Sequence, residues 1–228
     1  MLRNSTINLY KIAGPFLSRA GNVGIFLADA NIPFKEHHIS RAEWLAARKQ
    51  FQTTAVKHAG HNSSLPSVRN PFGSTPTIEV NGQWYAHTTP ILRLIARELG
   101  RYDGKSNEEK YLVDAVADIT ADWRAAWIDM LFSKDRYIQK SRPRFVDACQ
   151  AYVQSRGGPY LLGDRISYAD ILMYGVIYDE TPALCQIGEH TPLHQLYRAV
   201  GERPRIKAYI ERWEATKPSC AEYGVVPK

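Results

Sequence analysis

The stretch NPFGSTPTIEVNGQWYAHTTPILRLIARELG, at residues 70–100, contains the signals that decide the fold. Pro76 opens a short extended run, and Asn81-Gly82 is a dipeptide that tolerates the positive φ angles of a two-residue hairpin turn. Because two strands pair across such a turn, residues 77–80 are expected to pair with residues 84–86. The sequence therefore predicts a β-hairpin here.

A helix is expected directly after the hairpin, and its first turn offers a place for an anion. Pro90 suits the first turn of a helix, where its missing N–H costs nothing, and Thr88 or Thr89 can cap it. Apolar residues then recur at helical spacing up to residue 99. A helix N-terminus carries free N–H donors and a partial positive charge, so a carboxylate or phosphate can lie there beside His87 and the two threonines.

The whole chain is typical of a globular protein kept in a reducing compartment. It has 228 residues, of which 44% are hydrophobic and 23% charged. No run approaches the roughly 18 to 20 apolar residues that a membrane helix needs, and the N-terminus lacks the apolar core of a secretory signal. The cysteines Cys149, Cys185 and Cys220 are far apart and odd in number. We therefore expect a cytoplasmic protein that does not bind membranes.

The net charge of +6 is concentrated in the N-terminal half. Residues 1–100 hold 11 Lys and Arg against 5 Asp and Glu, whereas the remainder is balanced. Such a field favours an anionic small molecule, although a solvated basic surface explains the same balance. The basic residues are scattered and form no nucleic-acid-binding motif, so no nucleic-acid partner is expected.

The N-terminal half predicts the element order βαβαββα. Residues 7–13 and 34–39 have the pattern of strands, and residues 20–30 that of the helix between them. Ser40 and Glu43 form an S-x-x-E box that can cap a helix running to residue 49, and a polar loop follows at residues 53–69. The hairpin and its helix complete this half.

The C-terminal half is expected to contain only helices. GRYDGKSN at residues 100–107 is a glycine-rich polar break, and we place a linker there between a domain at 1–99 and a domain at 108–228. Helical patterns follow at residues 108–133, 143–156, 168–178, 192–201 and 203–216. Ser167 and Asp170 form a reciprocal cap in which the serine hydroxyl accepts from the Asp170 N–H, a structural role worth about 1 kcal/mol.

One motif is PFGSTP at residues 71–76 followed by TIEVNG at residues 77–82, and a second is GDRISYAD at residues 163–170. Both resemble motifs of the cytosolic glutathione transferases, and residues 39–44 and 112–118 look most like the sigma and related classes of that family. The resemblance covers most of the chain, with residues 50–69 as an insertion. It implies a thioredoxin-like N-terminal domain (α/β) followed by an α-helical bundle, that is, the glutathione transferase fold. Ser74, His87 and Thr88 depart from the Gln, Gln and Ser of the family pattern.

The resemblance also implies a glutathione site. In the family the proline matching Pro76 is cis, the backbone before it pairs with the cysteinyl part of glutathione, and residues matching His87 and Thr88 hold the γ-glutamyl carboxylate. The carried-over glutathione-binding candidates are Trp44, Arg48, Lys49, Ser74, Thr75, Pro76, His87, Thr88 and Asp114. Trp44 and Arg48, with Lys49 as a substitute, match residues that touch the glycyl end. Asp114 matches an aspartate that reaches across a homodimer interface, although it can equally be a solvated helix charge.

Two hydroxyls are candidates for activating the thiol. A thiol of pKa about 8.5 is mostly protonated at pH 7, and one hydrogen bond to the thiolate is enough to lower that pKa by a unit or more. Tyr10 lies in the first strand, as in the tyrosine classes, but an ungapped count from Arg19 places the family tyrosine at Ala13. Ser18, beside Arg19, lies within one position of the serine that other classes use. We place Tyr10 first and keep Ser18 open.

The expected function is conjugation of the glutathione thiolate to small hydrophobic electrophiles, in detoxification, by a cytoplasmic homodimer. Glutathione is the cosubstrate, and no metal is expected because neither His37-His38 nor His58-x-x-His61 has the spacing of a metal site. One alternative is a non-catalytic binding or regulatory protein of the same fold. The other is a glutathione-dependent isomerase or peroxidase.

Overall fold

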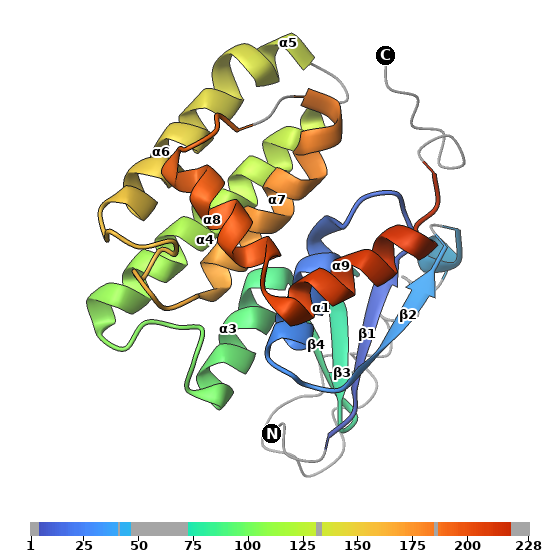
Figure 1. Ribbon diagram of the computed structural model, residues 1–228. Coiled ribbons are helices and arrows are strands. Elements are labelled where there is room, and N and C mark those ends of the chain that lie inside the picture. The colour runs from blue at the N-terminus through green and yellow to red at the C-terminus, as the bar shows by residue number, and fades with distance from the viewer. Residues whose placement is uncertain (1–4, 41, 47–72, 131–133, 185–186, 220–228) are drawn as a thin grey trace. The chain divides into compact units, whose positions relative to one another are not determined.

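The computed structural model describes residues 5–40, 42–46, 73–130, 134–184 and 187–219, with side chains left aside at 181–184 (Figure 1). These residues form two units. Residues 5–98 and 209–219 belong to the first unit, and residues 99–208 belong to the second. The last helix therefore contributes to both, whereas the sequence placed all of it in the second domain.

The first unit contains a four-stranded sheet in the order β2-β1-β3-β4. Its strands are β1 (Ile7–Ile12), β2 (Phe34–Ile39), β3 (Thr77–Val80) and β4 (Gln83–Ala86). β1 pairs with β2 in parallel, whereas the other two pairings are antiparallel. The predicted hairpin is present: Asn81 and Gly82 form its turn with φ angles of 52° and 79°. Thr77 pairs with Ala86, as the two-residue turn requires.

Two helices of the first unit form its core with the sheet: α1 (Ser18–Asp29), which contacts β1, and α3 (Thr88–Leu99). Alternate residues of β1 are buried, and Ile7 and Leu9 are fully covered. Apolar positions at helical spacing complete this core, namely Val23, Phe26, Leu27, Ile91, Leu92 and Ile95. The expected capping box also exists, because Ser40 N donates to Glu43 Oε2 at 2.8 Å and Glu43 N donates to Ser40 Oγ at 3.1 Å. The extension of that helix to residue 49 lies outside the described residues.

The second unit consists of helices. They are α4 (Asn107–Asp129), α5 (Lys134–Arg136), the π-helix η1 (Tyr137–Ser141), α6 (Arg142–Gln154), α7 (Tyr168–Leu184), α8 (Pro192–Gly201) and the start of α9 (Pro204–Thr216). The sequence ended α7 at residue 178, which is wrong by six residues. Asp179 and Glu180 lie inside the helix, where they are buried and paired with Arg124 and Arg142. The architecture confirms the expected α/β unit followed by a helical one.

The Ser167–Asp170 cap differs from the expected geometry. The Asp170 carboxylate accepts from Ser167 N at 2.7 Å, from Ser167 Oγ at 2.7 Å and from Leu161 N at 2.8 Å. The serine hydroxyl therefore donates to the carboxylate instead of accepting from a backbone N–H. Burial raises the pKa of Asp170 to about 6, although these hydrogen bonds oppose the shift.

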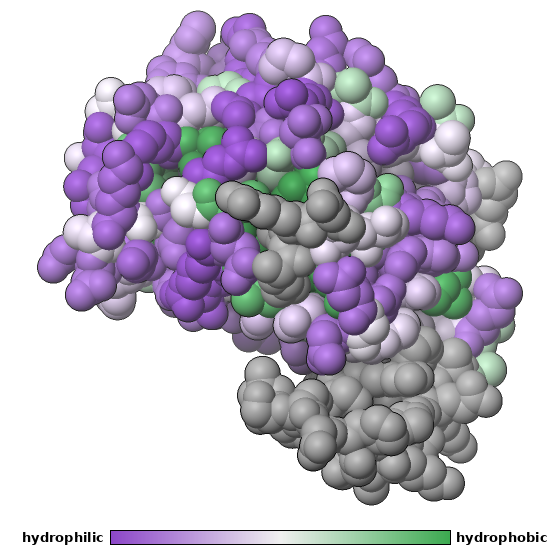
Figure 2. Space-filling model, turned by 90° about the horizontal axis from the view of Figure 1, so that it is seen from below, coloured by the Kyte–Doolittle hydropathy of each residue, from purple (hydrophilic) through white to green (hydrophobic). Residues whose placement is uncertain are grey.

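The surface drawn in Figure 2 is mostly hydrophilic, and its hydrophobic residues form small separate groups. Within the described part of the chain, no helix combines the length and apolar character needed to cross a membrane.

Candidate functional site

Sheet register brings the predicted thiol-activating tyrosine next to the predicted glutathione-binding proline. The Thr75–Pro76 peptide bond is cis and leads directly into β3. Tyr10 of β1 pairs with Thr77, the residue after this proline, and Thr77 in turn pairs with Ala86 of β4. His87 follows Ala86. Tyr10, Pro76 and His87 therefore lie at one end of adjacent strands, although they are far apart in the sequence.

The turn before β3 is held by its own backbone. Gly73 has a φ of 64°, which glycine adopts without strain, and the Thr77 hydroxyl donates to the Ser74 carbonyl at 2.9 Å. Ser74, which replaces the family glutamine, is half-buried. These contacts fix the conformation of the backbone that leads into the cis bond.

The N-terminus of α3 offers hydrogen-bond donors to an anionic ligand. His87 has a φ of 69° and is exposed, whereas Thr88, the first residue of the helix, is buried. Within the described residues the Thr88 Oγ1 is buried and has no hydrogen-bond partner. A buried hydroxyl without a partner costs about 1–3 kcal/mol, which a carboxylate accepting from it would recover. The helix N–H groups favour the same ligand, so the residues present fit a carboxylate.

Tyr10 lies in an aromatic stack on the sheet. Its ring centroid is 4.6 Å from that of His37 and 5.1 Å from that of Trp84, and both pairs are nearly parallel. Burial raises the pKa of Tyr10, and the charge of Glu79 adds to the rise. The phenol is therefore neutral at pH 7 and can donate its hydrogen to an acceptor such as a thiolate.

A chain of hydrogen-bonded polar side chains, which no sequence pattern indicated, holds this stack. Asn8 Nδ2 donates to Glu79 Oε2 at 2.6 Å, and Asn8 Oδ1 lies 2.9 Å from His37 Nε2. Because a carboxylate only accepts, the amide nitrogen must face Glu79, so Nε2 of His37 carries a hydrogen. The period-2 alternation of β1 places Asn8 and Tyr10 on one face, but their partners depend on strand register, which the sequence alone did not supply.

Ser18 is the first residue of α1 and has a φ of 63°. Its Oγ accepts from Ala20 N at 3.3 Å, so the hydroxyl has a local contact at the start of the helix. A serine hydroxyl that accepts from the N–H two residues further on is typical of helix capping. Both thiol-activating candidates thus lie in the first unit, and only Tyr10 is placed beside Pro76 by strand pairing.

The remaining predicted glutathione-binding residues lie outside the strand ends and the α3 N-terminus described above. Trp44 is 6% exposed and lies in the short helical segment at residues 42–46. Arg48 and Lys49 lie outside the described residues. Asp114 is on α4 in the second unit, where its carboxylate accepts a hydrogen bond from the buried Tyr168 hydroxyl.

Within residues 5–40, 42–46, 73–130, 134–184 and 187–219, no group of three or more His, Cys, Asp or Glu could hold a metal ion. His58 and His61 lie outside these ranges. His38 has a separate contact, because its Nε2 lies 3.3 Å from Glu36 Oε2.

Comparisons with known proteins agree on one family. The family described as "Glutathione S-transferase, C-terminal domain" matches residues 121–212. A glutathione S-transferase from Dirofilaria immitis is 24% identical over 211 residues, covering 89% of this chain and 92% of that protein. Human glutathione S-transferase A2 is 27% identical over 194 residues, covering 78% and 86%.

Solved structures with the same fold come from several classes of these enzymes. The pi-class glutathione S-transferase of Onchocerca volvulus superposes with a TM-score of 0.72 at 22% identity, over 92% of this chain and 94% of that one. The sigma-class enzyme of Fasciola hepatica superposes with a TM-score of 0.72 at 17% identity, over 91% and 96%.

Proposed function

This chain belongs to the cytosolic glutathione transferase superfamily, and from that membership we propose that it conjugates the thiolate of glutathione to small hydrophobic electrophiles. The fold is the glutathione transferase fold that the motifs predicted. Relatives 24–27% identical over most of the chain carry the name glutathione S-transferase, which supports transferase activity.

The observation that carries the proposal is the strand register. It pairs Tyr10 with Thr77, the residue after the cis Thr75–Pro76 bond, and pairs Thr77 with Ala86, two residues before the buried Thr88 hydroxyl. We propose that the γ-glutamyl carboxylate lies at the N-terminus of α3, where it accepts from Thr88 and the helix N–H groups. The backbone at Thr75 then pairs with the cysteinyl part of glutathione. His87 and Ser74 complete this side of the site.

Thiol activation is assigned to Tyr10. A phenol that donates to sulfur stabilises the thiolate over the thiol, and a hydrogen bond to a charged acceptor is worth about 1.5–3 kcal/mol. Each unit of thiol pKa corresponds to about 1.4 kcal/mol, so one such bond is sufficient for a shift of one to two units. Ser18 is the alternative donor, assisted by the N-terminus of α1.

The other parts of the site follow the family pattern. Trp44, with Arg48 or Lys49, would hold the glycyl carboxylate, and Asp114 would reach the γ-glutamyl ammonium of a partner subunit in a homodimer. A cytoplasmic location and a role in detoxification are part of the same proposal. Of the classes, the sigma and related ones remain our proposed assignment, because residues 39–44 and 112–118 resemble theirs.

A non-catalytic binding protein is the second candidate. Ala13 favours this candidate. It directly follows β1, and an ungapped count from Arg19 places the family tyrosine at this alanine, which has no hydroxyl. A protein with no suitably placed hydroxyl would bind glutathione without activating its sulfur.

A glutathione-dependent isomerase or peroxidase is the third candidate. It would use the same thiolate and would differ from a transferase only in the second substrate on which that thiolate acts.

Conjugation of glutathione to an activated aryl chloride tests these functions. We expect Tyr10→Phe to lower kcat at least tenfold with little change in binding to immobilised glutathione. Tyr111→Phe, which removes a hydroxyl from a tyrosine that is 74% exposed, is the matched control. Loss of rate in Ser18→Ala alone would move the role to Ser18. Retained glutathione binding with no turnover would favour the binding protein, and failure to bind glutathione would reject the glutathione assignment.

A further inference from the structure

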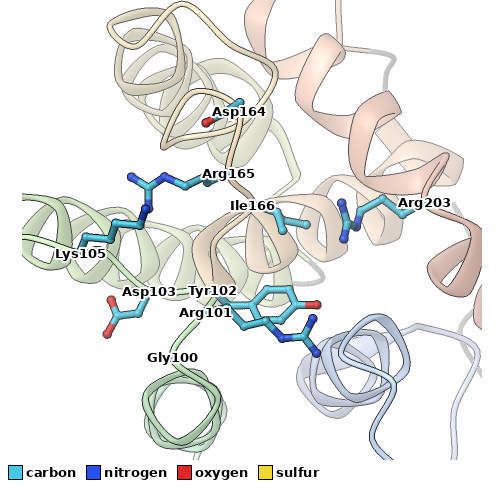
Figure 3. Close-up of a pocket in the computed structure, with 9 residues that line it drawn as sticks. All are labelled: Gly100, Arg101, Tyr102, Asp103, Lys105, Asp164, Arg165, Ile166 and Arg203. Atoms are coloured by element: carbon cyan, nitrogen blue, oxygen red, sulfur yellow. The ribbon is translucent and has the colours of Figure 1, made fainter.

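A cavity in the second unit gathers cationic side chains that the transferase reaction does not use (Figure 3). It has a volume of about 290 Å³ and lies where the segment joining α3 to α4 meets residues 164–166 and the residue before α9. The cations that line it are Arg101, Lys105, Arg165 and Arg203. Among the described residues, two carboxylates line it, those of Asp103 and Asp164, and Figure 3 shows them at its margins.

The walls of the cavity are held in place by backbone contacts. Tyr102 forms a bridge with Ser167, and Tyr168 N donates to the Tyr102 carbonyl at 2.9 Å. Gly104 packs so closely on the first turn of α4 that an added Cβ would lie 2.6 Å from the Glu109 Cβ. The cavity is therefore formed before any ligand arrives, which lowers the ordering cost of binding.

The cations keep their positions through contacts at the cavity edge. Arg165 Nη2 donates to Glu109 Oε1 at 2.5 Å, Arg203 Nη1 donates to the Tyr160 hydroxyl at 3.4 Å, and Arg101 Cζ lies 5.2 Å from the Tyr102 ring centroid. A guanidinium has five N–H donors in a planar fork, so it can bind a further oxygen while it keeps these partners. Even with Glu109 counted, positive charge exceeds negative charge around the cavity.

We propose that this cavity binds a phosphate group, either free or as a phosphate monoester. A phosphate at pH 7 carries about −1.5 to −2 charges, so it is attracted to a cavity whose four cations outnumber the carboxylates around them. Its oxygens suit the fork geometry of arginine, and Arg203, which Figure 3 shows turned toward Tyr102 and Ile166, is the central ligand. The site is distinct from the glutathione site, because none of its lining residues is among those assigned to glutathione.

Calorimetric titration of the full chain with inorganic phosphate tests the proposal. The titration is made at constant ionic strength, with chloride replaced by phosphate, in the presence and absence of saturating glutathione. We expect saturable binding that Arg203→Gln and Lys105→Gln each weaken at least tenfold. Arg205→Gln, an identical change at an exposed residue outside the cavity, should leave the affinity within twofold. Lys105 is exposed, so its replacement retains the fold.

A parallel titration with glycerol 3-phosphate identifies the source of the phosphate. Tighter binding of the ester supports a phosphate monoester, and equal binding supports free phosphate. Absence of saturable binding, or equal affinity in Arg203→Gln and Arg205→Gln, would overturn the proposal. Loss of phosphate binding on addition of glutathione would also overturn it, because phosphate would then occupy the glutathione site. These outcomes do not depend on whether the protein conjugates glutathione.

Discussion

The phenolic hydroxyl of Tyr209 donates a hydrogen bond of 2.6 Å to Oε1 of Glu36, which ties the second part of α9 to β2. The buried Lys11 ammonium lies 3.7 Å from the same oxygen. Burial alone would raise the pKa of Glu36, but Lys11 and the hydrogen bonds from Tyr209 and His38 together lower it. Glu36 is therefore an ionised acceptor at neutral pH, and the Tyr209 bond to it is charge-assisted.

Removing the Tyr209 hydroxyl should destabilise the protein. We expect Tyr209→Phe to lower the free energy of unfolding by about 1–3 kcal/mol, because the half-buried carboxylate loses a donor while the ring packing is kept. Urea denaturation at pH 7 measures this change. Tyr111→Phe, at a tyrosine that is 74% exposed, should change the free energy by less than about 0.5 kcal/mol. Equal effects of the two substitutions would contradict the role of the bond.

Gly24 is required by the same tyrosine. A Cβ added at Gly24 would lie 2.6 Å from Tyr209 Cζ, inside the ring's contact distance. We expect Gly24→Ala to lower the free energy of unfolding by about 1–3 kcal/mol through overpacking, although alanine is the better helix former. Gly188→Ala is the control, since its Cβ would meet only a methyl group at 3.5 Å. An unchanged or higher stability in Gly24→Ala would show that α9 shifts freely away from α1.

Asp170 should make stability depend on pH in the direction opposite to most carboxylates. Its folded pKa of about 6 lies above the ordinary aspartate value, so the stability it contributes is fully present below about pH 4 and is lost as the pH rises to about 6. The difference in unfolding free energy between wild type and Asp170→Asn should therefore fall by about 3 kcal/mol over that range. Urea denaturation at several pH values measures it. A difference that rises with pH would mean that the three donors outweigh burial.

Local signals in the sequence predicted much of this fold. Asn81-Gly82 predicted the hairpin, and the pairing extends one residue closer to the turn than expected, to Val80 with Gln83. Ser40 and Glu43 predicted their own reciprocal hydrogen bonds, since both partners lie within one helical turn. These features depend on neighbours in the chain, which a single sequence displays.

Features that depend on distant partners could not be predicted in the same way. Asp179 and Glu180 extend α7 because Arg124 and Arg142 neutralise them, and those partners are 55 and 38 residues away. The stack of Tyr10 between His37 and Trp84 likewise depends on the pairing of three strands. Sequence reasoning identified Tyr10 as a candidate, but the side chains that position it became visible only with the register.

The buried Thr88 hydroxyl gives a prediction that separates ligand binding from folding. Because Thr88 Oγ1 has no hydrogen-bond partner within the described residues, replacing it with a methyl group should not destabilise the free protein. We expect Thr88→Val to keep or raise the melting temperature, while the KM for glutathione rises about tenfold and kcat changes little. A hydrogen bond to a carboxylate is worth about 1.5–3 kcal/mol, so a tenfold loss of affinity is the lower end of the range.

Thr89→Val is the matched control for that experiment, since the neighbouring threonine is only half-buried at the same helix N-terminus. It should leave the KM for glutathione within about twofold. Binding of a glutathione analogue that lacks the γ-glutamyl carboxylate should be equally weak in wild type and in Thr88→Val, because the hydroxyl then has no acceptor in either protein. An unchanged KM in Thr88→Val would place the carboxylate elsewhere, and a lower melting temperature would mean that the hydroxyl already serves the fold.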